Sequence, residues 1–143
     1  MKKMLLILAL GVSLFANDII IKSSKYSVND TIVKLRDMVR AKGFGVFAII
    51  NHQANANMID MKLRESKLIV FGNPKLGTEL MQENMLASLD LPLKILVYED
   101  KDGSTKIAYR NASWLKKLHG LHNNKVVAKI DGGLNKLTDK VAK

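Results

Sequence analysis

The histidines of this sequence are its best candidates for acid–base chemistry near neutral pH. His52 directly follows an apolar, strand-like stretch, and the small residues Ala54 and Ala56 leave space beside it. An imidazole at a strand end can act as a base, a ligand or a hydrogen-bond donor. His52 is therefore a candidate catalytic residue, with a structural histidine as the alternative. The carboxylates considered as its partner are Asp60 and Asp90.

His119 and His122 stand three residues apart, a spacing that can place two imidazoles on one metal ion. Gly120 is expected to end the helix that carries them, however, and a histidine near a helix C-terminus is favoured by the helix dipole alone. The chain has no cysteine, which excludes thiolate metal sites, cysteine nucleophiles and disulfide chemistry. We predict no metal site, and the sequence indicates no particular cofactor.

The segment Gly72-Asn73-Pro74-Lys75 predicts a turn that opens a helix. Gly72 permits a sharp turn, Asn73 is a suitable N-cap, and Pro74 fits the first helical position. Helix N-termini attract anions, and Lys75 and Thr78 could add donors. The marks of a nucleotide-binding P-loop are absent. The sequence predicts either a well-capped turn or a site for a small anionic ligand, whose candidate ligand-binding residues are His52, Gly72, Asn73, Lys75 and Thr78.

Helical and alternating patterns surround these residues. Apolar residues at spacings of three and four follow Ser27 and predict a helix that ends at Gly43, and a second helix is expected from Pro74 to about Ser88. The buried face of that second helix is expected to consist of Leu80, Met81, Met85, Leu86 and Leu89. Strands are expected near residues 18–22, 44–50, 67–71, 94–99 and 105–109, with a hairpin turn at Asp102-Gly103.

These elements predict a single α+β domain with two layers. About five strands form one mixed or mostly antiparallel sheet, and three or four helices pack on it. Residues 51–57 are expected to form a loop or a short helix. We expect the domain to span residues 17–122, followed by a basic amphipathic helical tail at 123–143. That tail could contact an anionic membrane surface, bind a partner or complete the core of the domain.

The N-terminus has the pattern of a secretory signal peptide. Lys2 and Lys3 precede an apolar run from Met4 to Phe15, and Ala16 offers a small residue for cleavage. We expect a signal peptide at 1–16 and a periplasmic mature chain without a transmembrane span. An uncleaved anchor is the alternative.

Charge narrows the choice of partners for the mature chain. It would carry 21 basic and 13 acidic residues, a net charge of +8. Such a field suits small anions, polysaccharide or anionic lipid. Because we expect the chain to be secreted, no nucleic acid partner is expected.

A set of short motifs resembles a known family. The motifs are Phe71-Gly72-Asn73-Pro74-Lys75-Leu76-Gly77-Thr78, Leu80-Met81-Gln82, Leu89-Asp90-Leu91-Pro92-Leu93-Lys94, Tyr98-Glu99-Asp100, Gly103 and Tyr109. Together they resemble the bacterial and archaeal DUF 302 family, a domain of unknown function, over about residues 19–118. The resemblance implies a compact sheet backed by helices, often in secreted or envelope proteins. It also implies an acidic residue and a histidine at the end of the second strand, where this chain has Asn51-His52.

Three functions remain open on the sequence alone. The first is a periplasmic module that binds a small anion between Asn73 and His52. The second is an enzyme that uses His52 as acid or base. The third is an envelope interaction protein that acts through its basic tail or as a homodimer.

Overall fold

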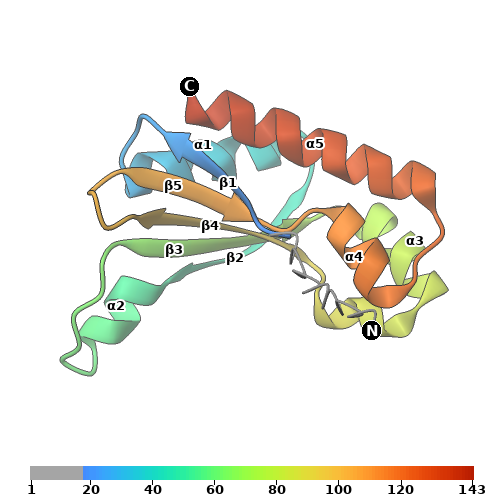
Figure 1. The fold of residues 1–143 in the computed structure, drawn as a ribbon, viewed down its shortest axis with the longest axis horizontal. Coiled ribbons are helices and arrows are strands. Elements are labelled where there is room, and N and C mark those ends of the chain that lie inside the picture. Colours follow the sequence, from blue (N-terminus) through green and yellow to red (C-terminus); the bar gives the residue numbers. More distant parts are fainter. Residues whose placement is uncertain (1–17) are drawn as a thin grey trace, which may run out of the picture.

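Five strands and five α-helices make up residues 18–143, the part of the chain that the computed structural model describes (Figure 1). The strands are β1 (Ile20–Ser24), β2 (Gly45–Asn51), β3 (Ser66–Gly72), β4 (Leu93–Glu99) and β5 (Thr105–Tyr109). The α-helices are α1 (Val28–Ala41), α2 (His52–Asn57), α3 (Pro74–Glu83), α4 (Ala112–His119) and α5 (Asn124–Ala142). A 3-10 helix, η1 (Met85–Leu89), follows α3. The expected signal peptide at 1–16 lies outside the described residues.

The strands form one antiparallel sheet in the order β1-β5-β4-β3-β2. β4 and β5 are joined by a tight turn at Gly103, whose φ of +81° is a conformation that glycine adopts without strain. Longer connections join the other consecutive pairs: α2 lies between β2 and β3, and α3 with η1 lies between β3 and β4. The expected α+β fold with a five-stranded, mostly antiparallel sheet is confirmed, and residues 51–57 contain α2.

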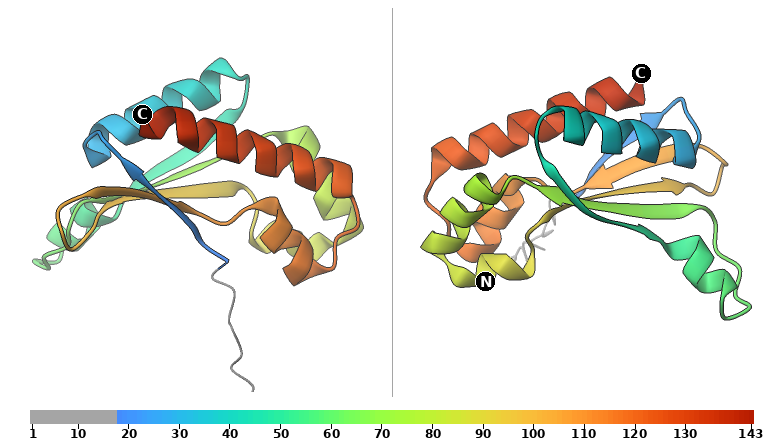
Figure 2. Two further views of the ribbon diagram at one scale, coloured as in Figure 1. Left: turned by 45° about the horizontal axis from the view of Figure 1, so that its top comes forward. Right: turned by 180° about the vertical axis from the view of Figure 1, so that it is seen from behind.

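α1 and α5 pack beside each other on one face of the sheet (Figure 2). Because side chains of a strand alternate between faces, one set from the central strands points into this layer. Ile69, Ile95 and Ile107 belong to this set and are fully buried, as is Leu35 of α1. The core therefore lies between the sheet and these two helices, and the other face of the sheet lies on the side away from them.

α5, which covers most of the expected basic helical tail at 123–143, contributes to this core. Its buried residues are Val126, Val127, Ile130, Leu134, Leu137, Thr138 and Val141. Their spacing of three and four residues gives the helix one continuous apolar face, which rests on the sheet and α1. Within residues 18–143 we find no helix that is long and apolar enough to cross a membrane.

The second expected helix is shorter than its sequence pattern suggests. α3 ends at Glu83 because Asn84 adopts extended backbone angles, and the Asn84 side chain then accepts a hydrogen bond from Leu86 N at 3.0 Å to start η1. Leu80 is buried and Met81 is half-buried, as expected for the buried face. The break turns the following segment away from the core, so the expectation was wrong for Met85, Leu86 and Leu89, which are exposed.

Candidate functional site

A pocket of about 800 Å³ opens between the start of α3, the start of β2 and the middle of α5. Most of its lining is apolar and comes from segments far apart in the sequence. The apolar and small lining residues are Phe44, Phe47, Phe71, Gly72, Pro74, Leu76, Gly77, Met81, Leu91, Pro92, Leu93, Ala128, Ile130, Gly132, Gly133, Leu134 and Leu137. The polar ones are Lys42, Asn73, Thr78, Lys129 and Lys136. Such a volume falls in the range of pockets that take small molecules.

The turn at the start of α3 is capped as expected. Asn73 Oδ1 accepts hydrogen bonds from Lys75 N at 3.0 Å and from Leu76 N at 3.3 Å. Pro74 has no N–H, and Gly77 N donates to Asn73 O at 3.0 Å. The backbone donors of the first turn are therefore already used, so an anion here would meet the helix dipole without free N–H groups.

The aromatic wall of the pocket lies over two glycines at the ends of paired strands. Gly45 and Gly72 face each other across β2 and β3, and the register of these strands shifts between Val46 and Ala48. Phe47 lies in this shift, and its ring would be 3.5 Å from a Cβ added at Gly45 and 3.7 Å from one added at Gly72. Both distances are ordinary van der Waals contacts, so the Phe47 ring packs closely over the two glycines beside the strand ends. The φ of Gly72 is not positive, so the structure does not require glycine there for the turn.

Small residues open the opposite wall, on α5. Gly132 and Gly133 line the pocket, and a Cβ added at either would meet no atom within 4 Å. Two consecutive glycines in a helix interior lower its stability by about 1 kcal/mol each relative to alanine. Their effect at this position is to keep side-chain atoms out of the pocket.

Polar contacts on both sides of these glycines fix the position of α5. Asp131 accepts a hydrogen bond from Ala112 N at 2.6 Å and another from the Ser113 hydroxyl. One turn later, the ammonium group of Lys22 on β1 contacts the side chains of Asn135, Thr138 and Asp139.

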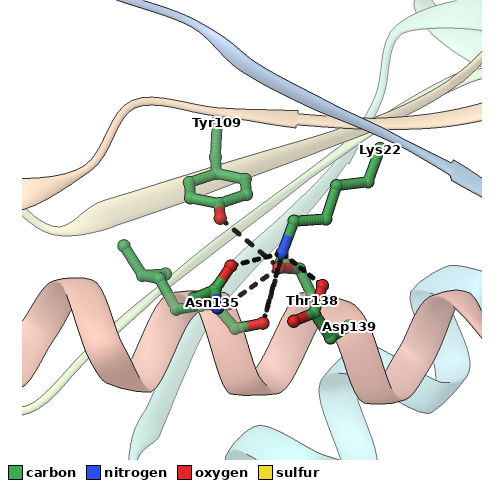
Figure 3. A network of polar contacts seen from close by, with 6 residues as sticks. Lys22, Tyr109, Asn135, Thr138 and Asp139 are labelled. Atoms are coloured by element: carbon green, nitrogen blue, oxygen red, sulfur yellow. Dashed lines mark hydrogen bonds and ion pairs between the residues drawn. The ribbon is translucent and has the colours of Figure 1, made fainter.

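Figure 3 shows this Lys22 network under α5. Lys22 Nζ donates to Asn135 Oδ1 at 2.8 Å, to Thr138 Oγ1 at 2.8 Å and to Asp139 Oδ1 at 2.6 Å. The Tyr109 hydroxyl lies 3.4 Å from Thr138 Oγ1. The Lys22 side chain is only 18% exposed, so these acceptors replace most of its water. The network joins the edge strand to the helix that forms the pocket wall.

Three lysines give the pocket a positive rim. Lys42, Lys129 and Lys136 all line it and are exposed, whereas no aspartate or glutamate is among the lining residues. The ion pairs of residues 18–143 involve other groups, namely Lys22 with Asp139, Arg36 with Asp37 and His119 with Asp90. None of the three rim lysines therefore forms an ion pair with a carboxylate of the described chain.

The structure brings some of the predicted site residues together and separates others. Gly72, Asn73 and Thr78 line the pocket, while Lys75 is exposed outside its lining. His52 lies at the other end of the sheet, because β2 and β3 are antiparallel and Asn51 pairs with Lys67 while Gly45 pairs with Gly72. At about 3.3 Å per residue, the two ends of β2 are about 20 Å apart. The expected site shared by His52 and Asn73 is therefore corrected: the antiparallel register places them at opposite ends of the sheet.

The second hypothesis required a carboxylate beside His52. Asp90, one of the two candidates, instead contacts His119, with 2.7 Å between Asp90 Oδ2 and His119 Nε2. Asp60 is exposed in the loop after α2, and its carboxylate contacts no histidine in the described residues. His52 is not among the residues that line the pocket at the start of α3. An acid–base role for His52 thus has no geometric support.

The two C-terminal histidines make contacts that join elements of the fold. His119 ends α4 and pairs with Asp90, and its side chain is 8% exposed. The backbone N–H of His122 donates to Glu83 Oε2 at 2.5 Å. Among residues 18–143, no three histidine or acidic side chains are arranged to hold a metal ion.

The lysine rim and the α5 wall were not identified from the sequence as parts of a site. One signal could have pointed to them. A glycine pair in the middle of an otherwise regular amphipathic helix costs stability, and this cost indicates that the helix surface there must stay free of side chains. For Phe44 and Phe47, by contrast, the sequence pattern predicts only a position in a strand.

Comparisons with known proteins agree with this fold. A solved structure, described as an uncharacterized conserved protein DUF302 from Bacillus stearothermophilus, superposes with a TM-score of 0.70 over 89% of this chain and 97% of that one, at 21% identity. A protein of Brucella suis biovar 1 (strain 1330) named fluoride-specific ion channel FluC 1 is 33% identical over 109 residues, which are 76% of this chain and 43% of that protein. Its namesake from Brucella abortus biovar 1 (strain 9-941) is 33% identical over the same length, which is 40% of that protein. The chain thus spans less than half the length of these curated relatives.

The family model described as domain of unknown function DUF302 matches residues 20–137, which include every strand and most of α5. The chain belongs to the DUF302 family.

Proposed function

We propose that this protein is a binding module for an amphipathic anion, a molecule with an apolar body and an acidic head group. The observation that supports this proposal is the combination of a largely apolar pocket of about 800 Å³ with three lysines and no acidic residue in its lining. The proposal keeps the anionic ligand expected from the sequence but moves it to one end of the sheet, without His52. It also adds an apolar body, because a small ion alone would leave most of this lining in contact with water.

The two parts of the ligand would contribute differently to its affinity. Each methylene that leaves water for the apolar walls adds about 0.8 kcal/mol, or about fourfold in affinity. A head group near exposed lysines would add less, since water screens such contacts to about 1 kcal/mol or below. Chain length would therefore decide affinity, and charge would decide which end of the ligand faces the rim.

A homologous series of carboxylates tests this proposal. We expect the dissociation constant to fall about fourfold for each added methylene until the pocket is filled, measured by titration calorimetry. The matching alcohols should bind more weakly to the wild type. They should bind equally well to the wild type and to a variant with Lys42→Gln, Lys129→Gln and Lys136→Gln. Affinity that is independent of chain length would refute the apolar body, and equal binding of carboxylate and alcohol by the wild type would refute the anionic head.

Fluoride is the small-anion alternative, because relatives that share 33% identity over 109 residues are named fluoride-specific ion channels. Sodium fluoride and inorganic phosphate therefore belong in the same titrations. Saturable binding of either ion that is unaffected by added carboxylate would favour a module for a small inorganic anion instead.

The same proposal places the mature chain in the periplasm, from the signal-peptide pattern of residues 1–16. Fractionation of an expressing bacterium should recover a protein that begins near Asn17 in the periplasmic fraction. Native mass spectrometry of that material should show a co-purified organic acid that is lost after denaturation. A chain that keeps residues 1–16 and pellets with the membrane would support the uncleaved anchor.

A further inference from the structure

Exposed apolar side chains form two groups at opposite ends of the molecule. The first, here called the tip, follows α2 and consists of Met58, Ile59, Met61 and Leu63, which are 47–82% exposed. The second, called the corner, consists of Met85, Leu86 and Leu89 on η1 and Leu118 on α4, which are 55–77% exposed. In both views of Figure 2, α2 with its loop and the η1–α4 region lie at opposite ends of the sheet, on the side away from α1 and α5.

One row of apolar residues crosses the sheet face between the tip and the corner, and Lys94, Tyr98 and Lys106 lie beside it on the same face. The register aligns Ile21, Ala108, Leu96, Leu68 and Ile50 in one row across the strands. Their neighbours along the strands, such as Ile69, Ile95 and Ile107, point into the core, so this row lies on the opposite face. At the corner end, this face has a hollow of about 270 Å³ whose lining includes Leu96, Ala108 and Trp114.

We propose that a second copy of this chain covers this face, with the tip of each copy on the corner of the other. A two-fold axis that lies between the two sheet faces, parallel to them and at right angles to the line from tip to corner, would form both contacts at once, because tip and corner lie at opposite ends of the same face. The apolar rows of the two sheets would then face each other. The hollow would take a side chain from the tip of the second copy.

The exposed area supports a partner of this size. At about 100 Å² for each fully exposed aliphatic side chain, the tip and the corner together expose roughly 500 Å² of apolar surface. Each group alone exposes only about half of this area. A two-fold contact that pairs the tip of each copy with the corner of the other would bury roughly 1,000 Å² of apolar surface from the two copies together, which is about the size at which a specific interface begins.

Both surfaces carry charges of both signs, which suits a second copy of the chain. The tip segment holds Asp60 together with Lys62 and Arg64, and an ionised carboxylate among residues that enter a bilayer is costly. The hollow is lined by Asp90, Lys94 and Arg110, and neither of its two cations forms an ion pair within the described chain. Asp60 of one copy can therefore meet a cation of the other.

The oligomeric state tests the proposal directly. We expect light scattering and sedimentation equilibrium to give twice the mass of one chain for the purified protein. Ile59→Glu and Leu89→Glu should each weaken dimerisation at least about tenfold, because each places a carboxylate inside the interface. Both residues are exposed in the monomer, so the circular dichroism spectrum should not change. Lys125→Glu, on the first turn of α5, is the matched control and should leave the dimer intact.

A cysteine experiment tests the arrangement of the two copies, since the natural chain has no cysteine. Chains with Ile59→Cys are mixed with tagged chains that carry Leu89→Cys, and the mixture is oxidised. Disulfides between the two kinds of chain should exceed those within either kind. A predominance of tip-to-tip or corner-to-corner disulfides would overturn the arrangement.

Two outcomes would overturn the proposal as a whole. One is a wild-type protein that remains monomeric at the highest concentration measured. The other is a monomer that sediments with phosphatidylserine vesicles and loses this property in the Ile59→Glu variant, which would assign the face to a membrane. Neither outcome depends on the ligand pocket, so this inference and the proposed function can fail separately.

Discussion

Filling the pocket from α5 should change stability and ligand binding in opposite directions. Gly133→Leu replaces a helix-interior glycine with a good helix former at a position where an added Cβ meets no atom within 4 Å. The folded state should gain about 0.8 kcal/mol, which for a chain of this size corresponds to a rise in Tm of about 3 °C. Urea unfolding followed by circular dichroism measures the gain.

The same substitution should weaken binding of the amphipathic anion. A leucine side chain at this position would occupy the space of about three methylenes of the ligand. Excluding these methylenes from the pocket weakens binding by about 2.4 kcal/mol, or about sixtyfold in affinity. Gly133→Ala adds one methyl group and should cost about fourfold, with a similar gain in stability. Titration calorimetry with the longest soluble carboxylate that binds the wild type measures both changes.

Lys140→Leu is the control, because it adds the same side chain to an exposed position of α5 outside the pocket. It should leave affinity unchanged. If Gly133→Leu stabilises the protein but binds the ligand as tightly as the wild type, the ligand does not occupy this pocket. If Gly133→Ala lowers stability, the explanation given for the glycine pair is wrong.

Three further substitutions test the supports of the fold. Lys22→Met removes the donor of the network with Asp139, which is about half exposed. It should lower the free energy of unfolding, measured in urea, by about 1–2 kcal/mol. An effect near zero would mean that α5 is held by its apolar face alone. Asn73→Ala should lower the free energy of unfolding by about 1 kcal/mol through loss of the helix cap. It should leave the affinity for carboxylates within a few-fold of the wild type. A large loss of affinity would show that the helix start contacts the ligand directly. Hydrogen bonds from the Ser104 hydroxyl and backbone N–H lower the pKa of Asp102 in the folded state. Asp102→Asn should therefore lose stability at neutral pH. The difference from the wild type should vanish as the pH falls below the ordinary aspartate pKa and through the lowered folded-state pKa, so a difference that persists in stronger acid would contradict this linkage.

Local signals in the sequence were reliable where one short segment determines the structure. Ser27 accepts a hydrogen bond from Asp30 N at 3.0 Å, as its position before an apolar helical pattern predicts. Gly120 ends α4 with a φ of +62°, as a C-terminal glycine should. In each case the residue acts on backbone groups within four positions, so no knowledge of the tertiary structure is needed.

The corner shows where such local reasoning fails. The spacing of Met85, Leu86 and Leu89 continues the apolar pattern of α3, and periodicity cannot detect that Asn84 interrupts the helix. An asparagine can cap a new helix as readily as it can occupy the surface of an old one. Met85, Leu86 and Leu89 therefore continue the apolar spacing of α3, but they lie at the surface and not in the core.

The site depended on information that is not local. The expectation that His52 and Asn73 would meet assumed that the two strand ends point the same way, as in a parallel sheet. His52 follows β2 and Asn73 follows β3, as predicted. The antiparallel pairing of β2 and β3 nevertheless places these two residues at opposite ends of the sheet.

The pocket needs a further long-range contact, since α5 begins about fifty residues after Asn73 and supplies one of its walls. The glycine pair that opens this wall weakens the helix wherever the helix packs, and only its position opposite Asn73 and Phe47 makes that weakness useful to a ligand. Both α5 and the turn at Asn73 therefore have to be in place before the pocket exists. A variant that displaces α5, such as Lys22→Met, should consequently reduce ligand affinity although Lys22 does not line the pocket.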